Sequence, residues 1–451
     1  MKHLQTHTIY LIGIGGIGMS AIARYFKQQG KEVSGYDRVS TPLSRQMETE
    51  GMNIHYKDDP AYIPCDAGLV IYTPAIPESN MELAYVRELN FNLRKRSEVL
   101  GMIAASYKPI AVAGTHGKTT ISSMIAHVMH STNNPVTALI GGIMSNYGTN
   151  MINDEDSKFM VAEADEYDRS FLKLHPYISV ISTVAADHLD IYGSVNKLEE
   201  SFSEFAFQTS AHGMLIIHED VVGRINLPEN KMVYGQGEKA DFRISNIRVR
   251  DHKYHFVLNT GTESAEISLN IPGLHNIENA ASAAAACTYS GMPLTDIAGA
   301  LETYRGVKRR FEYILNEEDK VFIDDYAHHP EELVACINTV KELYPDEKIT
   351  GIFQPHLYTR TRDFAEQFAT SLEGLDEVIL LDIYPAREEP INGVSSEMIL
   401  DSMDHAHKSI CQRDDILELI KKKDPKVLIT MGAGDIDQLV EPIKALLQKK
   451  A

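Results

Sequence analysis

The stretch TIYLIGIGGIG, residues 8–18, decides how the first part of the chain folds. It begins with strand-forming residues, Thr8–Ile12, and its glycines then follow the spacing Gly-x-Gly-x-x-Gly before a predicted helix, Met19–Gln29. Such glycines let backbone amides approach a diphosphate at the N-terminus of the helix. Asp37, after a second predicted strand at Glu32–Tyr36, completes the pattern. The stretch predicts a Rossmann-like unit that binds NAD or a UDP-sugar; a tight turn without a ligand is the alternative.

The same stretch superficially resembles a signal peptide, because a charged start precedes an apolar run. The glycines between Gly13 and Gly18 disfavour the continuous helix that such a peptide needs. The cysteines form no Cys-x-x-Cys pair and fit core residues in a reducing compartment: Cys65, Cys287, Cys336 and Cys411. We therefore expect a cytoplasmic protein from which no leader is removed.

Composition limits what the whole chain can be. Its 451 residues suggest three domains, and 43% hydrophobic with 24% charged residues is typical of a folded protein rather than a disordered one. No apolar run approaches the length of a membrane-spanning helix, so we expect no membrane insertion. The formal net charge of −20 argues against a nucleic-acid partner, which needs a basic face. A chain this acidic must bind phosphates with a few placed cations.

A second glycine loop, Gly114-Thr-His-Gly-Lys-Thr-Thr120, follows a predicted strand, Ile110–Ala113, and precedes a predicted helix. Backbone amides of such a loop bind phosphate oxygens, with Lys118 placed to reach the β- and γ-phosphates and Thr119 to hold Mg²⁺. The general P-loop pattern has a glycine where this chain has Val112, so the match is partial. A structural turn without a ligand is the alternative.

Acidic residues follow the next predicted strand of this central part, Phe159–Ala162. Open α/β sheets bind ligands at the carboxyl ends of their strands, so the position of Glu163 favours a Mg²⁺ ligand, directly or through water. His188, after a further strand, is a candidate ligand of a second metal ion. For Glu166 and Asp168 we prefer a solvated acidic loop.

Further motifs lie in the second half of the chain. Asn276 and Asn279 share one face at the start of an alanine-rich helix, where they either cap the helix or meet the edge of an adenine ring. The densest basic run, Arg305–Phe311, is either solvated or placed to meet a polyanion. The polar segments Asp324–Pro330 and Gln354–Arg360 begin where predicted strands end, so both should face one crevice. Structural histidines are the alternative to substrate contacts there.

The combination of these motifs resembles the Mur ligase family, whose members are ATP-dependent amide-forming enzymes. The motifs stand in family order: Gly13-Ile-Gly-Gly-Ile-Gly18, Gly114-Thr-His-Gly-Lys-Thr-Thr120, Glu163-Ala-Asp-Glu166, Asp187-His188, Gly273-Leu-His-Asn-Ile-Glu-Asn279, Val307-Lys-Arg-Arg-Phe311, Asp324-Asp-Tyr-Ala-His-His-Pro330 and Phe353-Gln-Pro-His-Leu-Tyr-Thr-Arg-Thr361. The resemblance covers nearly the whole chain, and the P-loop variant that lacks the first glycine is the family's own form.

The resemblance implies an α/β fold of three domains. A Rossmann-like domain at 1–107 would bind a UDP-sugar, a P-loop ATPase-type central domain at 108–313 would bind ATP, and a Rossmann-like C-terminal domain at 314–451 would close over ATP and the amino acid.

A reaction in peptidoglycan precursor synthesis is implied as well. The lactyl carboxylate of UDP-N-acetylmuramate would attack the γ-phosphate of ATP, and the amine of L-alanine would then attack the acyl phosphate, giving an amide, ADP and phosphate. The meeting of two anions requires screening by Mg²⁺ and Lys118.

Individual roles also follow from the resemblance alone. Catalytic roles fall to Lys118, His188, His328 and Arg360. ATP binding is implied for Gly114, Thr115, His116, Gly117, Lys118, Thr119, Thr120, His275, Asn276, Asn279, Arg310 (on phosphate) and Asp325 (on the ribose). Sugar-nucleotide binding is implied for Gly15, Gly16, Ile17, Gly18, Asp37 and Thr73. Mg²⁺ in two sites, replaceable by Mn²⁺, would be held by Thr119, Glu163 and His188.

The chain departs from the family pattern at three places. Leu357 stands where many relatives have arginine, so an anion contact is missing or replaced there. The segment Tyr72–Pro77 differs from the more usual serine-containing version. Phe202 stands at the spacing of the carbamylated lysine of several sister ligases, so we expect no such lysine.

Three alternative functions stay open at this point. A sister ligase would attach a recycled peptide to the same sugar nucleotide, although Phe353–His356 and Tyr358–Arg360 favour L-alanine. An NAD-dependent dehydrogenase follows from Gly13–Gly18 and Asp37, but it leaves Lys118 unexplained. A non-catalytic nucleotide-binding regulator is the third. The sequence gives no indication of the oligomeric state.

Overall fold

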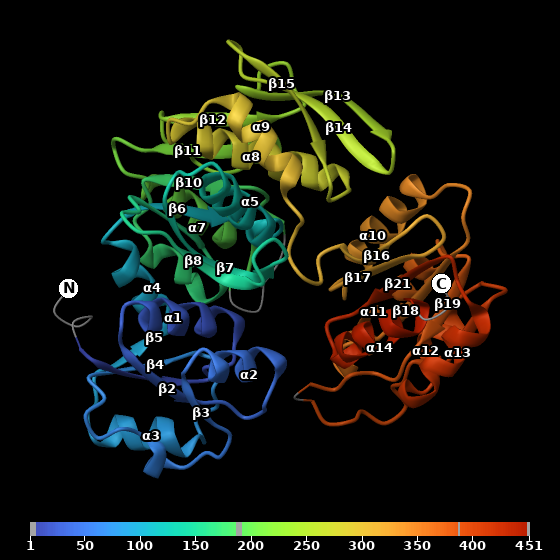
Figure 1. Ribbon diagram of the computed structural model, residues 1–451, viewed down its shortest axis with the longest axis horizontal. Helices are drawn as coiled ribbons and strands as arrows, with labels where there is room; N and C mark the ends of the chain where they lie inside the picture. The colour runs from blue at the N-terminus through green and yellow to red at the C-terminus, as the bar shows by residue number, and fades with distance from the viewer. Residues whose placement is uncertain (1–5, 186–191, 387, 449–451) are drawn as a thin grey trace. The chain divides into compact units, whose positions relative to one another are not determined.

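The computed structural model describes residues 6–185, 192–386 and 388–448, without the side chain of residue 168. The chain forms two compact units (Figure 1). The first contains Met1–Ile247, Phe256–Ser268 and His275–Arg305, and the second contains Arg248–His255, Leu269–Leu274 and Gly306–Ala451.

The first sheet is parallel throughout, with the strand order β3-β2-β1-β4-β5. Its strands are β1 (Thr8–Ile12), β2 (Glu32–Tyr36), β3 (Asn53–His55), β4 (Leu69–Tyr72) and β5 (Leu93–Lys95). Its helices are α1 (Ile17–Gln28), α2 (Pro42–Thr49), α3 (Met81–Glu88) and α4 (Arg96–Ala104), with the short turn η2 (Pro60–Tyr62). This order matches the first five strands of the doubly wound Rossmann order, so the Rossmann-like prediction is confirmed.

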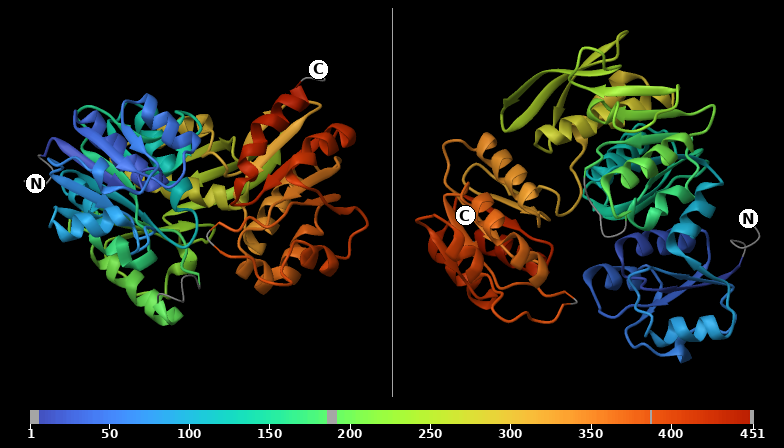
Figure 2. Two further views of the ribbon diagram at one scale, coloured as in Figure 1. Left: turned by 90° about the horizontal axis from the view of Figure 1, so that it is seen from below. Right: turned by 180° about the vertical axis from the view of Figure 1, so that it is seen from behind.

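Helices cover both faces of this first sheet, with α1 and α3 on opposite sides (Figures 1 and 2). Successive residues of a strand point to opposite faces, and β1 follows this rule. Leu11 belongs to the buried cluster that contains the residues of α1, whereas Tyr10 belongs to the cluster that contains Leu83 of α3. The apolar run Thr8–Ile12 is buried along its whole length because helices cover both sides.

The central sheet has ten strands in the order β15-β14-β13-β12-β11-β10-β6-β9-β7-β8. Its strands are β6 (Lys108–Ala113), β7 (Val136–Met144), β8 (Thr149–Asn153), β9 (Phe159–Glu163), β10 (Ile178–Ile181), β11 (Met214–His218), β12 (Lys231–Gly235), β13 (Phe242–Arg250), β14 (Lys253–Asn259) and β15 (Ser264–Leu269). The pairs from β13 to β7 are parallel, and β8 returns antiparallel to β7. Strands β13, β14 and β15, which follow one another in the chain, are neighbours at one edge of this sheet.

The helices that accompany the central sheet begin and end as follows: α5 (Lys118–Ser131), α7 (Val195–Phe207), α8 (Leu274–Tyr289) and α9 (Leu294–Thr303), with the short turns η3 (Tyr167–Lys173) and η4 (Glu219–Val221). Helix α5 starts directly after Gly117, which adopts a left-handed conformation. Lys118, the lysine of the second glycine loop, therefore lies in the first turn of the helix.

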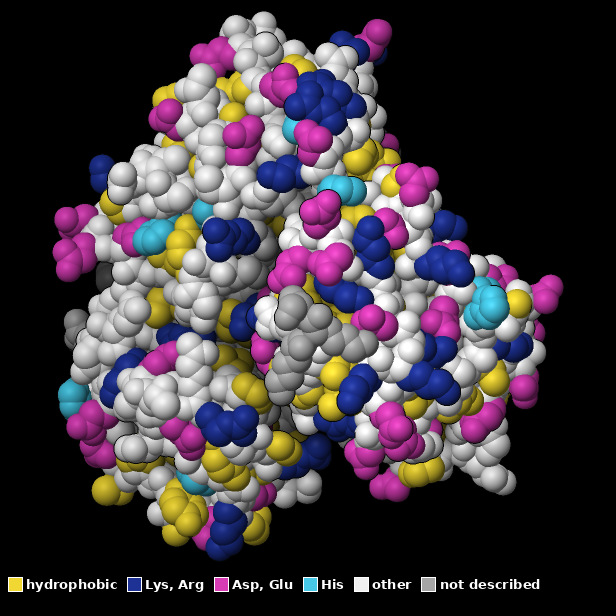
Figure 3. Space-filling view, turned by 45° about the vertical axis from the view of Figure 1, so that its right-hand side comes forward, with side chains coloured by type: hydrophobic (Ala, Val, Ile, Leu, Met, Phe, Trp, Pro, Cys, Tyr) yellow, Lys and Arg dark blue, Asp and Glu magenta, His cyan; other side chains and the backbone are white. Residues whose placement is uncertain are grey.

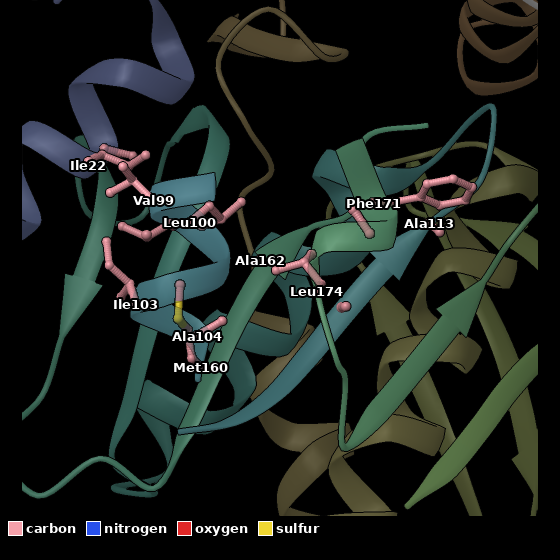
Figure 4. Packing of buried hydrophobic residues seen from close by; sticks show 14 of the residues in the cluster. Ile22, Val99, Leu100, Ile103, Ala104, Ala113, Met160, Ala162, Phe171 and Leu174 are labelled. Carbon is pink, nitrogen blue, oxygen red and sulfur yellow. The ribbon is translucent and has the colours of Figure 1, made fainter. Parts of the chain in front are cut away.

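One hydrophobic cluster joins the first sheet to the central sheet. Helix α4 contributes Val99, Leu100 and Ile103, which lie between Ile22 of α1 and Met160 of β9 (Figure 4). All of these side chains are buried, and burying one such side chain contributes about 1.5–3 kcal/mol. The cluster therefore holds α1, and the glycine loop that precedes it, against the central sheet.

The third sheet lies in the second unit and has the order β16-β17-β21-β18-β19-β20, parallel except for β16. Its strands are β16 (Glu312–Asn316), β17 (Val321–Asp325), β18 (Ile349–Phe353), β19 (Glu377–Leu380), β20 (Lys408–Ile410) and β21 (Val427–Met431). Its helices are α10 (Pro330–Leu343), α11 (Tyr358–Leu372), α12 (Glu397–Ser402), α13 (Ile416–Lys423) and α14 (Val440–Gln448), with the turns η5 (Arg413–Asp415) and η6 (Asp435–Leu439). The predicted α/β architecture is confirmed for this part as well.

Acidic and basic side chains are interspersed on the face shown in Figure 3. Lysine and arginine side chains are therefore present on this face despite the excess of acidic residues in the chain. Among the helices that the structure describes, none combines the length and apolar character needed to cross a membrane.

Candidate active site

The second glycine loop, Gly114–Thr120, is here called the phosphate loop and forms a tight turn between β6 and α5. Gly114 and Gly117 have φ values of +138° and +84°, which residues with side chains rarely adopt. A Cβ atom at Gly114 would lie 2.1 Å from Ser182 Oγ, and one at Gly117 would lie 2.7 Å from Asn279 Oδ1. Both glycines are therefore required by close neighbours as well as by their backbone conformation.

The loop is also tied to the end of the neighbouring strand β10. The Thr115 and Thr183 hydroxyl groups lie 2.9 Å apart, and the backbone N–H of His116 donates to Thr183 Oγ1 at 3.0 Å. The N–H of Ala185 donates in turn to Thr115 Oγ1 at 3.1 Å. These bonds fix the loop in front of the N-terminus of α5, where the helix dipole favours an anion.

Lys118 is engaged by a buried carboxylate. Its Nζ lies 2.8 Å from each carboxylate oxygen of Glu166 and donates to the carbonyl of Gly114 at 2.7 Å. The side chain of Glu166 is fully buried, so the expectation of a solvated acidic loop is wrong for this residue. Glu166 can be buried because its carboxylate pairs with Lys118 of α5. The other residue expected in a solvated loop, Asp168, has a side chain that lies outside the described residues.

Glu163 lies at the end of β9, one strand away from the phosphate loop. Its Oε1 accepts the backbone N–H of Gly141 at 2.6 Å, and the hydroxyl of Thr119 is a further hydrogen-bond partner. Burial raises the pKa of Glu163, and these hydrogen bonds act in the opposite direction. A Cβ atom at Gly141 would lie 2.6 Å from both carboxylate oxygens, so only glycine leaves room for this contact.

The donors around Glu163 suit a hard divalent cation. A carboxylate and a threonine hydroxyl supply the oxygen ligands that Mg²⁺ prefers, and a cation there would offset the cost of burying the carboxylate. His188, expected at a second metal site, lies outside the described residues.

The residues expected at the adenine ring lie next to the phosphate loop. Asn276 and Asn279 are buried in the first turns of α8, and the Nδ2 of Asn279 donates to the Oδ1 of Asn276 at 3.1 Å. Asn279 is also the residue that approaches Gly117, so the structure brings the asparagine pair and the loop together. His275 is exposed at the same helix start.

The first glycine loop is surrounded by residues from three strand ends. The N–H of Gly15 donates to Asp37 Oδ2 at 2.8 Å, and a Cβ at Gly13 would lie 2.9 Å from Thr73 Cγ2. A Cβ at Gly18 would lie 2.9 Å from Arg96 Nη1. The structure therefore brings Asp37 and Thr73 to the loop, together with an arginine that sequence reasoning missed.

A cavity of about 340 Å³, here called the loop pocket, lies beside this loop. It is lined by residues of both sheets of the first unit: Gly16, Ile17, Gly18, Met19, Ala21, Ile22, Thr73, Ala75, Arg96, Leu100, Leu139, Ile140, Gly141, Glu163 and Asp165. Gly15 and Asp37 are not among these lining residues. The pocket thus connects the first glycine loop with the carboxylate beside the phosphate loop.

Arg96 gives the loop pocket a cation. Its Nη2 lies 3.5 Å from Asp165 Oδ2, a long and partly exposed contact that leaves the guanidinium available to an anion. The available signal in the sequence was the basic run Arg94-Lys95-Arg96, which ends strand β5 at the edge where parallel sheets bind ligands.

In the second unit, Asp325 is held by the backbone. Its carboxylate accepts the N–H groups of Phe311 and Ala327, each at 2.7 Å, and burial raises its pKa to about 6. Strand β17 extends through Asp325, two residues further than predicted. Two arginines of the basic run before it have different surroundings. Arg309 pairs with the buried Asp324 at 3.4 Å. Arg310 is exposed, and its guanidinium lies 5.4 Å from the ring centre of Tyr326.

The two polar segments of the second unit converge as predicted. The ring centres of His328 and His356 lie 6.3 Å apart, and Arg360 Nη1 lies 3.4 Å from His356 Nδ1. His328 Nδ1 lies 3.1 Å from Glu332 Oε2. Burial opposes ionisation of Glu332, but its contacts with His328 prevail and lower its pKa to about 2. The structure thus places the candidate residues His328 and Arg360 in one cluster.

Three protein-family models match successive parts of the chain, in the order of the three sheets. The family models "Mur ligase family, catalytic domain", "Mur ligase middle domain" and "Mur ligase, glutamate ligase domain" match residues 8–108, 112–287 and 309–434. The chain belongs to the Mur ligase family. The resemblance drawn from the motifs is therefore confirmed.

Relatives of this Mur ligase named UDP-N-acetylmuramate–L-alanine ligase match it over their full length. The protein of Parabacteroides distasonis is 46% identical over 450 residues, covering 98% of this chain and 97% of the relative. That of Cytophaga hutchinsonii is 44% identical over 462 residues, covering 100% of this chain and 99% of the relative. Among solved structures, the UDP-N-acetylmuramate-alanine ligase of Thermotoga maritima matches with a TM-score of 0.85 at 27% identity, over 98% of this chain and all of that one.

A likeness of fold alone extends to a murein peptide ligase from Psychrobacter arcticus, with a TM-score of 0.69 at 22% identity over 98% of each chain. Mur ligases are ATP-dependent ligases with a three-domain α/β fold. This chain is an ATP-dependent ligase with that fold as well. Membership in a ligase family goes against the alternatives of a dehydrogenase and a non-catalytic regulator.

Proposed function

We propose that this chain joins L-alanine to the lactyl carboxylate of UDP-N-acetylmuramate, using ATP and releasing ADP and phosphate. The observation that carries the proposal is the loop pocket, whose wall combines Gly16–Gly18 with Glu163. A sugar nucleotide bound at the first glycine loop would have its reactive end in the cavity that reaches the phosphate-transfer residues. The names of the full-length relatives support these substrates.

ATP is assigned to the phosphate loop. Loop amides and the N-terminus of α5 would bind the phosphates, and Asn276 with Asn279 would meet the adenine edge. Lys118 would exchange part of its contact with Glu166 for the γ-phosphate, so its charge would follow the transferred group. Glu163 and Thr119 would hold Mg²⁺, or Mn²⁺ in its place, and that ion would neutralise charge on the phosphates. A second ion is assigned to His188.

The sugar nucleotide is assigned to the loop pocket. Its diphosphate would meet the amides of Gly15–Gly18 and the guanidinium of Arg96, with Asp37 and Thr73 as further contacts. Its lactyl carboxylate would lie toward Glu163 and attack the γ-phosphate, which turns a poor leaving oxygen into a good one.

The residues of the second unit are assigned to the later step. His328 and Arg360 would place the acyl phosphate and L-alanine, and Arg310 would contact phosphate. The Asp325 carboxylate accepts the backbone amides of Phe311 and Ala327, and we assign it a further hydrogen bond from a ribose hydroxyl. We place the domain boundaries at 107/108 and 313/314 and the reaction in the cytoplasm.

The test is ATP-dependent release of phosphate with Mg²⁺ and UDP-N-acetylmuramate against L-alanine, glycine, L-serine and a free tripeptide. We expect strong dependence on L-alanine and loss of turnover in Lys118→Ala. Preference for the tripeptide would favour the sister ligase instead. Release that ignores every amino acid, or full activity in Lys118→Ala, would refute the proposal.

A further inference from the structure

The hairpin β7–β8 contacts both halves of the loop pocket. On β7, the backbone N–H of Gly141 binds Glu163, the candidate metal ligand, and the residues around Gly141 line the pocket. On β8, an edge strand of the central sheet, Asn150 donates a hydrogen bond to α1. This helix follows the first glycine loop, Gly13–Gly18, here called the sugar-nucleotide loop. The same hairpin therefore touches the phosphate-transfer side and the sugar-nucleotide side of the cavity.

Asn150 uses its whole amide group in this contact. Its Nδ2 donates to the carbonyl of Ile17 at 2.7 Å and to Ser20 Oγ at 3.0 Å. Its Oδ1 accepts from Arg24 Nη1 at 2.5 Å. Asn150 and Ser20 are fully buried and Arg24 is 3% exposed, so a polar group of these three that loses its partner lowers the stability of this contact.

The orientation of Asn150 is fixed from the far side by an ion pair. Arg24 Nε and Nη2 donate to the two carboxylate oxygens of Glu50 at 2.8 and 2.7 Å. A buried guanidinium is stable only when it is paired, so this fork keeps Arg24 in place against the amide. With Oδ1 committed to Arg24, the Nδ2 of Asn150 must face Ile17.

We propose that Asn150 is a positioning residue that fixes the sugar-nucleotide loop at the distance from Glu163 that phosphate transfer requires. The inference rests on the proposed function. Ile17 both lines the loop pocket and receives the hydrogen bond of Asn150, so its carbonyl determines how Gly16–Gly18 face the cavity. The phosphate loop is held by separate bonds from Thr183, so ATP binding does not depend on Asn150.

Steady-state kinetics of two Asn150 variants test the proposal. Asn150→Ala removes all three bonds, whereas Asn150→Asp keeps an acceptor for Arg24 and loses both donors. We expect KM for UDP-N-acetylmuramate to rise by about tenfold in each variant, as for the loss of a buried hydrogen bond, with KM for ATP within about twofold of the wild type. Asn153→Ala is the matched control, because Asn153 lies on the same strand and its side-chain oxygen accepts a hydrogen bond from Thr137 on β7.

The outcomes separate this inference from the proposed function. A wild-type enzyme without L-alanine-dependent turnover would refute the function itself. If the wild type is active, an unchanged KM for the sugar nucleotide, an equal rise in both KM values, or a lower melting temperature with normal KM values would overturn the role of Asn150. Should neither variant fold, Glu50→Gln weakens the same network from its half-exposed end, and the same ratio of KM values decides.

Discussion

At the scale of single residues, Lys118 and Glu166 show what a motif can and cannot indicate. The glycine loop predicts a lysine that meets phosphate, because its residue types and spacing are local. Its partner is 48 residues away in the chain, and an acidic residue in a polar loop is usually solvated. The pairing is a tertiary contact that no spacing reveals. Arg96 is a different case, because the basic run at the end of β5 was a local signal that the motif at the first glycine loop does not include.

A double-mutant cycle measures how strongly this pair is coupled. Lys118→Ala leaves a buried carboxylate without its cation, and Glu166→Gln leaves the ammonium without its anion. We expect each single change to lower the free energy of unfolding by about 3 kcal/mol. The double variant should lose clearly less than the sum of the two, as measured by chemical denaturation.

The exposed pair Lys57 and Asp59 is the matched control for this cycle, because its Nζ–Oδ2 distance of 2.7 Å is similar but its lysine is largely exposed. Its two substitutions should be additive. Additive losses at Lys118 and Glu166 would contradict the buried contact.

At the scale of elements, the strands were predicted better than the helix starts. The strands Thr8–Ile12 and Glu32–Tyr36 appear with the predicted bounds, since a short strand between turns is a local signal. Helix α1 begins at Ile17 rather than Met19, and α5 begins at Lys118, inside the glycine loop that was expected to precede the helix. In both cases the helix starts right after a glycine, before its apolar periodicity becomes visible.

The start of α11 contains a strained residue. Leu357 has φ of +73°, a region that favours glycine. Its N–H donates to the carbonyl of Tyr384 at 2.9 Å, and its own carbonyl accepts the N–H of Thr361 at 3.1 Å. These bonds hold the unfavourable conformation at the point where the chain turns from His356 into the helix that carries Arg360.

Comparing glycine with alanine at position 357 isolates this strain. Leu357→Gly should be more stable than Leu357→Ala by about 1 kcal/mol in thermal or denaturant unfolding, because alanine keeps the Cβ that disfavours positive φ. At Glu366, exposed on the same helix, the order should reverse, with alanine more stable than glycine by about 1 kcal/mol. The same order at both positions would show that Leu357 is not strained.

At the scale of the whole molecule, the net charge of −20 is compatible with a site for anions. The described cations around the candidate site are few and individually placed: Arg96 in the loop pocket, Lys118 on its carboxylate, and Arg310 and Arg360 in the second unit. The α/β architecture and the family followed from the sequence because the motifs recur in order along it. The domain boundaries near Tyr107 and Tyr313 and the roles of the individual site residues stay predictions.

Removal of divalent metal should separate the two nucleotide sites. We expect a chelator to abolish phosphate release, and Mg²⁺ or Mn²⁺ to restore it, because the phosphates of ATP must be screened before a carboxylate can approach. Binding of UDP-N-acetylmuramate, measured by calorimetry, should survive the chelator, since its loop uses backbone amides and Arg96. Turnover that persists without metal would contradict the role assigned to Glu163.

The shared wall of the loop pocket has a consequence for inhibition and resistance. A compound that fills this cavity of about 340 Å³ rests on Gly16–Gly18, Gly141 and Glu163. A Cβ atom at Gly141 would collide with the carboxylate of Glu163, and one at Gly18 would collide with Arg96. A mutation that excludes the compound by adding bulk at these glycines would also displace Glu163 or Arg96, which we propose to bind the substrates, so we expect resistance by this route to lower the activity.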